Sequence, residues 1–405
     1  MSRPHPAWAL AIALAIAPFA VVLQNRVMAP IALLGFAGCA GLGAWRGWRP
    51  ARPEGLAWPL LAVLAWMALS ALWAPEAGRA LDATLRLALS VILAWFAAEV
   101  LRREEPSRLL APAVALGVAL GIAAAGFDAL TGNALRAAVR GLKSWDITLS
   151  FGLKNAASVI SVLLPLAVFA PALPRWLRVA MAVAGAAVVI LLPGDSAKIA
   201  VLAGLAAGIA GRWRPGATSA ALAAVAALSM LALPWLLGAA LPLDAARLPE
   251  SAAHRLLIWD FAATRIAEHP ILGWGMEASR AIPGGSGGPD MAMLAAFGLG
   301  AKSAWFAGAQ LLPLHPHNLA LQAWLELGAV GAALIAWLLA ATARRARGGA
   351  ASGAFAAALV IAMLSYGAWQ YWWVATLLLA AVVAAALPGR HGSLLDASRG
   401  KQPEA

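Results

Sequence analysis

Two histidines and a series of polar residues form the part of the sequence best suited to chemistry. His315, His317 and Asn318 lie within the run HPHN, and Gln322 and Glu326 follow Asn318 at four-residue spacing. On a helix this spacing places three polar side chains on one face. Histidine is the one side chain whose unperturbed pKa allows proton transfer near neutral pH. The run therefore indicates either an acid–base site or a helix cap with interfacial histidines.

Basic residues near the ends of apolar segments form a second set of candidates: Arg255, Lys198, Arg86 and Lys154. Fixed guanidinium and ammonium groups can stabilise a phosphate leaving group where no metal ion does so. The alternative for each of them is a solvated or snorkelling surface charge. Arg265 and Lys302 are expected to be surface charges only. A metal site on His315 and His317 is disfavoured, because no third ligand follows at a suitable spacing.

The composition requires a membrane. Of 405 residues, 62% are hydrophobic and 12% are charged, about half the charge of a soluble domain. The net charge of +12 does not point to nucleic acid, because the basic residues lie in short loops and form no known nucleic-acid motif. The single cysteine, Cys39, excludes an intramolecular disulfide and a cysteine metal site. The sequence thus predicts an all-α polytopic membrane protein.

Apolar runs long enough to cross a bilayer divide the chain. We expect twelve transmembrane helices, at about 7–23, 28–45, 56–73, 80–101, 109–126, 151–170, 177–193, 196–211, 216–240, 316–341, 352–366 and 370–387. This gives nine helices over 1–240, a long loop over 241–315, three helices over 316–387 and a tail over 388–405. Within the long loop, residues 254–269 have the spacing of an amphipathic helix. Pro316 is expected in the first turn of the tenth span, because its missing N–H would be unpaired there.

The arginine-rich short loops set the expected orientation. Arg46, Arg49 and Arg52, and the loops near residues 102–108, 212–214 and 344–347, are predicted to be cytoplasmic by the positive-inside rule. Both termini are then cytoplasmic, and the segments 127–150 and 241–315 lie outside. A long loop in an otherwise compact chain is where function is expected.

Motifs that are missing narrow the chemistry. The sequence has no G-x-x-x-x-G-K-[ST], no H-E-x-x-H and no Asp-x-Asp pair. ATP-driven transport, zinc hydrolysis and metal-bound sugar-nucleotide chemistry are therefore disfavoured. We expect no cofactor and no metal.

The chain resembles the O-antigen ligase and O-antigen polymerase superfamily. The resemblance rests on residues 314–328 (LHPHNLALQAWLELG) with Gly331 beyond, and on residues 255–259 (RLLIW) followed by Ile266, HP at 269–270 and GWG at 273–275. Lys198 departs from the family, which usually has a Ser-Arg pair there, and lysine cannot form the bidentate fork of arginine.

The resemblance implies an inner-membrane glycosyltransferase with a GT-C-like fold and a periplasmic active site. It implies transfer of a glycan from undecaprenyl diphosphate to lipid A–core without metal or ATP, with His317 as the catalytic histidine and Arg255 as the loop arginine. Lys198, Arg86, His315, Asn318 and Lys154 are the expected substrate-binding residues. The open alternatives are the related polymerase, which extends a lipid-linked glycan, and a polytopic transporter or flippase.

Overall fold

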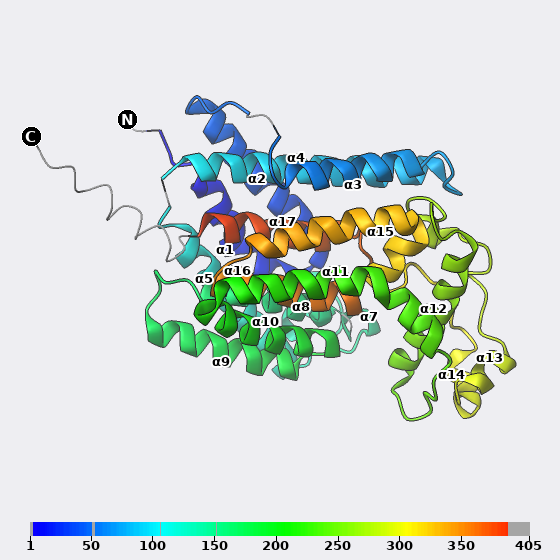
Figure 1. Ribbon diagram of the computed structural model, residues 1–405. Coiled ribbons are helices and arrows are strands. Elements are labelled where there is room, and N and C mark those ends of the chain that lie inside the picture. Colours follow the sequence, from blue (N-terminus) through cyan, green and yellow to red (C-terminus); the bar gives the residue numbers. More distant parts are fainter. Residues whose placement is uncertain (1–2, 51–52, 106, 151, 388–405) are drawn as a thin grey trace, which may run out of the picture.

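The computed structural model describes residues 3–50, 53–105, 107–150 and 152–387, which form helices and loops with no strand among them (Figure 1). The expected tail at 388–405 lies outside the described residues. The all-helical prediction is confirmed for the part of the chain that the structure describes.

Twelve long helices coincide with the twelve expected segments. They are α1 (Ala7–Leu23), α2 (Met28–Trp45), α3 (Ala57–Ser70), α4 (Ala77–Arg103), α5 (Leu110–Leu130), α8 (Gly152–Val168), α9 (Arg175–Leu191), α10 (Asp195–Trp213), α11 (Pro215–Ala240), α15 (Leu319–Arg345), α16 (Gly349–Leu364) and α17 (Tyr371–Ala386). The helical segments Asn25–Trp45, Ala77–Arg103, Leu110–Leu130, Pro215–Ala240 and Leu319–Arg345 are long and apolar enough to cross a membrane. This agrees with a polytopic membrane protein, while the count of twelve spans stays a prediction.

Shorter helices lie in the two long connections. The first holds α6 (Ala134–Arg140) and α7 (Ile147–Ser150), and the second holds α12 (Glu250–Glu268), α13 (Met291–Ala296) and α14 (Ser303–Phe306). The expected amphipathic helix is α12, which begins four residues before His254 and buries Ile258 and Phe261. Figure 1 shows α12, α13 and α14 together at one end of the bundle. The division of the chain into domains stays a prediction.

Close helix contacts hold the bundle together around α8, whose residues from Ala156 to Val168 are all buried. Helices α10 and α16 approach so closely that a Cβ at Gly353 would lie 2.7 Å from the Gly204 carbonyl oxygen. Lipid tails are as apolar as leucine, so helices in a bilayer associate through such small-residue packing. Lys154 lies in the first turn of this central helix.

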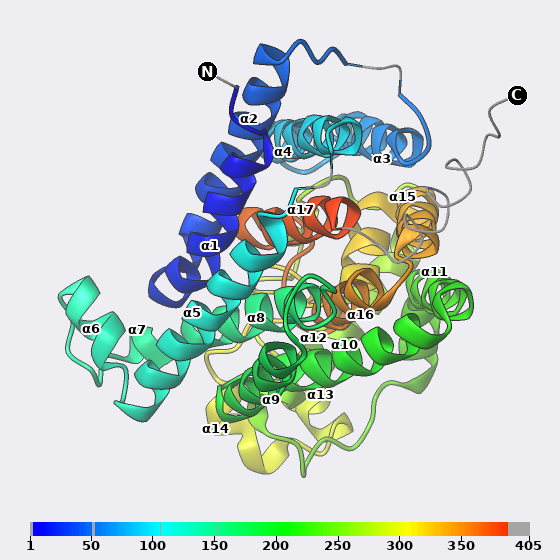
Figure 2. The same cartoon turned by 90° about the vertical axis from the view of Figure 1, so that its left-hand side faces the viewer.

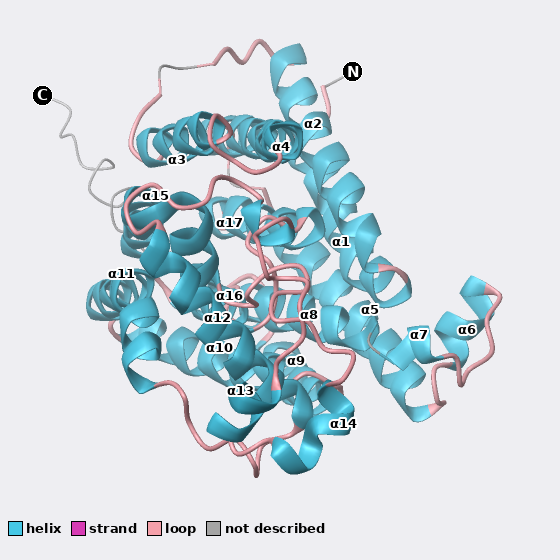
Figure 3. Ribbon diagram, turned by 90° about the vertical axis from the view of Figure 1, so that its right-hand side faces the viewer, coloured by secondary structure: helices cyan, strands magenta, loops and turns pink. Residues whose placement is uncertain are grey.

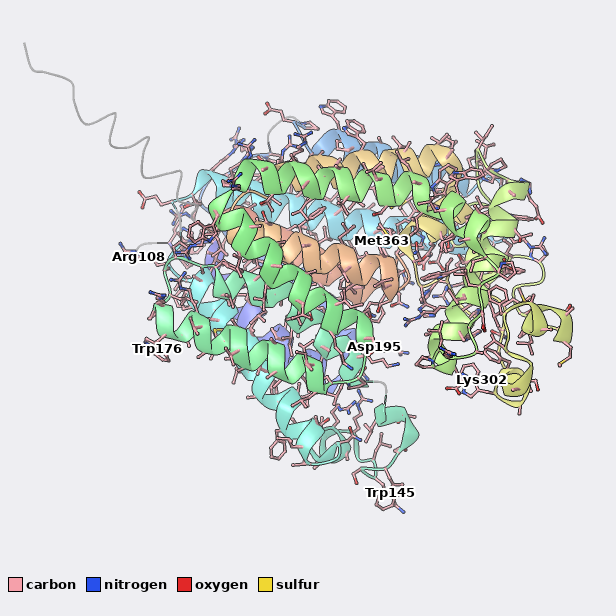
Figure 4. The ribbon with its side chains drawn as sticks, turned by 60° about the horizontal axis from the view of Figure 1, so that its bottom comes forward. Arg108, Trp145, Trp176, Asp195, Lys302 and Met363 are labelled. Carbon is pink, nitrogen blue, oxygen red and sulfur yellow. The ribbon has the colours of Figure 1, made fainter. Side chains whose placement is uncertain are left out.

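The arginine-rich loops and the long 241–315 connection lie at different ends of the bundle. Arg46 bonds Glu104 at 2.9 Å, which joins the loops after α2 and α4 at one end. Figure 2 views the bundle from the side of the chain ends, and Figure 4 places Arg108 and Trp176 there, away from Asp195 and Lys302. The arginine-rich loops therefore lie opposite the long 241–315 connection. Which side of a membrane each end faces stays a prediction.

The start of the tenth span corrects one expectation. Helix α15 begins at Leu319 rather than at Pro316, and Asn318 is its N-cap, with Oδ1 accepting a 3.0 Å hydrogen bond from Leu321 N–H. His317 has φ +56°, outside the helical region. Asparagine is among the strongest N-cap residues, so the cap set the helix start and left Pro316 in the preceding loop. The expected helix cap is thus present.

Candidate functional site

The two motif regions of the sequence meet at a kink in α15. Gly328 has φ +64° within this helix, and a Cβ there would lie 2.2 Å from the Ile271 carbonyl oxygen. A Cβ at Gly273 would lie 2.5 Å from Gly328 N, so glycine is required on both sides of the contact. Gly275 N–H donates to the Glu326 carbonyl at 2.7 Å. This contact ties the segment after α12 to α15.

The His317 imidazole is held in one tautomer. Its Nδ1 lies 2.5 Å from the carbonyl oxygen of Ser365, at the end of α16. A carbonyl can only accept, so Nδ1 carries the proton, and Nε2 keeps a free lone pair. The imidazole is therefore oriented as a base at Nε2.

Burial keeps this imidazole neutral. Burial is the main cause that lowers the pKa of His317 to about 4; the Ser365 hydrogen bond opposes it, and the charges of Arg255, His254 and Lys154 add to it. An imidazole with such a pKa carries no charge at pH 7 and can accept a proton.

The His315 ring packs against the His317 ring. The two rings are 4.3 Å apart between centroids and nearly perpendicular. His315 is 4% exposed, its Nδ1 accepts a 3.3 Å bond from His317 N–H, and its Nε2 lies 2.9 Å from the Gln370 amide nitrogen. Burial, with the charges of His317 and Arg280, lowers the pKa of His315 to about 3. The contacts of His315 are thus mainly internal.

The charges of Arg255 on α12 and Lys154 on α8 act on His317. Arg255 is half-buried and takes part in none of the ion pairs formed by the described residues. Its pKa is lowered, chiefly by burial. Tyr366 donates to the Lys154 carbonyl at 3.1 Å, and burial raises the pKa of Tyr366 to about 12. Lys154, Arg255 and Tyr366 are thus linked to one another although they are distant in sequence.

Lys198 stands at the edge of this group. Its Nζ lies 3.1 Å from Asp195 Oδ1 in the first turn of α10, and the Asp195 carboxylate also acts on Arg255 and Lys154. Figure 4 shows Asp195 at the end of the bundle that faces the α12 segment. Lys198, Arg255 and Lys154 thus all interact with this carboxylate.

Arg86 does not join this group. Its Nε bonds Asp82 at 2.9 Å, its side chain is 59% exposed, and its guanidinium carbon lies 5.3 Å from the centre of the Tyr371 ring. The expected role of Arg86 in substrate binding stays a prediction.

The polar face of α15 lies inside the protein, as its spacing predicted. Asn318, Gln322 and Glu326 are at most 3% exposed. Glu326 accepts bonds from Ser279 Oγ, Trp369 Nε1 and the Gln322 amide. This face therefore ties the loop between α16 and α17, which carries Ser365, to the helix. Asn318 caps α15 and does not orient the imidazole, because the Ser365 carbonyl does.

A cavity of about 810 Å³ opens on the other side of His315. Figure 3 looks onto this end of the molecule, where loops cross between the helix ends. The cavity is lined by Asn25, Arg26, Ala29, Arg79, Asn155, Glu277, Arg280, Leu314, His315, Gln322, Tyr366, Gly367, Trp369, Gln370, Tyr371 and Trp372. We did not predict Arg26, Arg79 or Arg280 as site residues from the sequence. The available signal was that Arg26 and Arg79 lie in predicted outer loops, where the positive-inside rule disfavours arginine.

Comparison with known proteins finds similarity to one family in the central part of the chain. Residues 180–336 match the model of the family described as O-antigen ligase. A candidate polysaccharide ligase of Rickettsia conorii is 45% identical over 89 residues, which cover 22% of this chain and 19% of that protein. A candidate polysaccharide ligase of Rickettsia prowazekii is 38% identical over 129 residues, 30% of this chain and 28% of the relative.

The matches thus span less than a third of the curated relatives. The family match includes Lys198, Arg255, His315, His317 and Asn318, whereas Lys154 and Arg86 lie outside it. Both motif regions and most of the candidate site residues lie within this match. Over residues 180–336 the chain is therefore similar to the O-antigen ligase family.

Proposed function

We propose that the protein is a glycosyltransferase that moves a polysaccharide from undecaprenyl diphosphate to lipid A–core. The observation that carries the proposal is the His317 imidazole, whose Nδ1–H is bound by the Ser365 carbonyl and on which the charges of Arg255 and Lys154 act. The family match over the same residues supports this reaction class. A base and a phosphate-binding group side by side are what transfer from a lipid diphosphate requires.

His317 Nε2 takes the proton of the acceptor hydroxyl as the hydroxyl oxygen attacks the anomeric carbon of the donor sugar. The bond between that carbon and the diphosphate oxygen breaks, and the lipid diphosphate leaves with the electron pair. A new glycosidic bond forms, and the imidazolium then returns its proton to the solvent. General-base assistance of this kind is worth a factor of about 10² to 10⁴.

Arg255 and Lys154 stabilise the negative charge that develops on the leaving diphosphate, with Lys198 at the edge. Partly desolvated cations are effective because their charge is poorly screened by water. Arg255 is the strongest of the three, because guanidinium binds two phosphate oxygens in a planar fork. These residues replace the divalent cation that many glycosyl transfers use, so the reaction is proposed to be metal-independent.

The proposed setting is the bacterial inner membrane, with the site in the periplasm and both termini in the cytoplasm. The arginine-rich loops at the opposite end of the bundle support this orientation through the positive-inside rule. The lipid-linked donor and the lipid-linked acceptor would both reach the site from the outer leaflet, among the membrane lipids that surround the helices.

Transfer by the purified protein in liposomes tests the proposal. With undecaprenyl-diphosphate glycan and lipid A–core supplied together, the glycan is expected to appear on lipid A–core. Growth of the lipid-linked glycan without transfer to lipid A–core would instead assign the polymerase reaction. No new glycosidic bond, with protein that retains its fold, would contradict a glycosyltransferase of either kind.

A further inference from the structure

The cavity beside His315 adjoins the proposed base without containing it. His315 lines the cavity, and its ring contacts the His317 ring at 4.3 Å between centroids. His317 and Arg255 are not among the lining residues. A molecule in the cavity would therefore lie about one imidazole ring away from the base.

The charge of the cavity favours an anion. Arg26, Arg79 and Arg280 line it together with one carboxylate, that of Glu277. Glu277 bonds Arg280 at 2.8 Å, and Arg79 bonds Glu76 at 3.0 Å. Arg26 takes part in none of the ion pairs formed by the described residues. A phosphate or carboxylate would find guanidinium donors from three separate segments of the chain.

The remaining walls suit a sugar. Trp369, Tyr371 and Trp372 line the cavity, and the amides of Asn25, Asn155 and Gln370 can donate to and accept from hydroxyl groups. A volume of about 810 Å³ lies within the range of small-molecule sites. The lining thus combines the groups that recognise a sugar bearing a negative charge.

The basic residues divide between the two histidines. Arg26, Arg79 and Arg280 line the cavity together with His315, whereas Arg255, Lys154 and His317 do not line it. Two substrates that meet at one base need separate sites, and the diphosphate of the donor has its partners on the His317 side.

We propose that the cavity lined by Arg26, Arg79 and Arg280 binds the anionic sugar headgroup of the acceptor. This inference rests on the proposed function, because it names the acceptor subsite of the same reaction. The arginines hold a phosphate or carboxylate that the acceptor carries, and the aromatic wall holds the sugar that presents its hydroxyl to His317. Binding from this side leaves Arg255 free for the donor.

Two probes separate this site from the donor site without requiring transfer. Glucosamine 1-phosphate serves as the acceptor-side probe and farnesyl diphosphate as the donor-side probe, each titrated against the full chain in nanodiscs. The Arg26→Gln/Arg280→Gln variant is expected to bind glucosamine 1-phosphate at least tenfold more weakly and farnesyl diphosphate as before. Arg255→Gln is expected to show the reverse. Arg344→Gln, an exposed arginine at the opposite end of α15, is the matched control and should change neither.

Several outcomes would overturn the assignment. Unchanged glucosamine 1-phosphate binding in the double variant would remove the arginines from its site. Weakened farnesyl diphosphate binding in that variant would make the cavity the donor site. Inorganic phosphate binding as tightly as glucosamine 1-phosphate would show a site for free phosphate alone. Absence of transfer with the expected binding pattern would contradict the proposed function and leave the anionic-sugar site standing.

Discussion

The two sides of the histidine pair carry positive charge in different ways. On the His317 side, Arg255 is half-buried and in no ion pair of the described residues, and burial lowers its pKa. On the cavity side, Arg79 and Arg280 are exposed and paired with Glu76 and Glu277. A partly buried, unpaired cation stabilises a developing charge more than an exposed, paired one. The first side therefore suits charge that forms during a reaction, and the second suits charge that a ligand already carries.

The largest expected effect is the loss of the base. We expect His317→Gly to lower kcat by about 10²- to 10⁴-fold, because the substitution removes the proposed base. Glycine is the better substitution here, because it adopts φ +56° without strain. Transfer in membranes, normalised to protein level, measures the effect. His315→Ala is the comparison and should lose clearly less, and equal losses would contradict the division of roles between the histidines.

Removal of Arg255 should have the next largest effect. We expect Arg255→Ala to reduce kcat by about 10²- to 10³-fold, the usual cost of losing one preorganised group that stabilises developing charge. Arg255→Lys should recover part of this loss, since it keeps the charge and loses the fork. Arg247→Ala, an exposed arginine just before α12, serves as the control. Wild-type kcat in Arg255→Ala would exclude this arginine from the diphosphate site.

The pH dependence of the transfer rate should show a smaller effect, which reflects the burial of His317. The base works when neutral, so activity is present above the pKa of His317, about 4, and is lost as pH falls through that value. The rate should therefore show no inflection near pH 6.5. Arg255→Gln removes a positive charge that faces His317 and should move the acid limb to higher pH. An acid limb near 6.5 in the wild type would contradict a buried neutral imidazole.

Chelation should have the smallest effect. Because arginine and lysine are proposed to stabilise the leaving diphosphate, transfer by purified protein should survive an excess of EDTA. The control is a metal-dependent glycosyltransferase assayed in the same buffer. Activity that falls with EDTA and returns with magnesium would show that a divalent metal ion, rather than Arg255 and Lys154, stabilises the leaving diphosphate.

The sequence predicted the helices well and their ends less well. Twenty-residue apolar runs allow few alternatives in a bilayer, so all twelve expected segments coincide with helices. The start of α15 was wrong by three residues, because the Asn318 cap outweighed the preference of Pro316 for a first turn. Such an outcome depends on local backbone geometry that spacing alone does not contain.

Residues of the candidate site could be predicted only where they belong to a sequence motif. His317 and Arg255 were predicted from motif resemblance, and Lys154 as a basic residue at a helix start. The substrate-binding role of Arg86 stays a prediction, and the structure places this residue over Tyr371, which lines the cavity. The Ser365 carbonyl has no sequence signature. Arg26, Arg79 and Arg280 meet only through the fold, and the first two were visible only as exceptions to the positive-inside rule.

Chemical rescue tests the central claim most directly. In His317→Gly, the absent side chain leaves space beside the Ser365 carbonyl, where free imidazole can bind and accept the acceptor proton. We predict that added imidazole raises the transfer rate of His317→Gly in a concentration-dependent and saturable way, with no increase for His315→Ala or the wild type. A rate in His317→Gly that stays near zero at every imidazole concentration, in protein that still binds farnesyl diphosphate, would contradict His317 as the base.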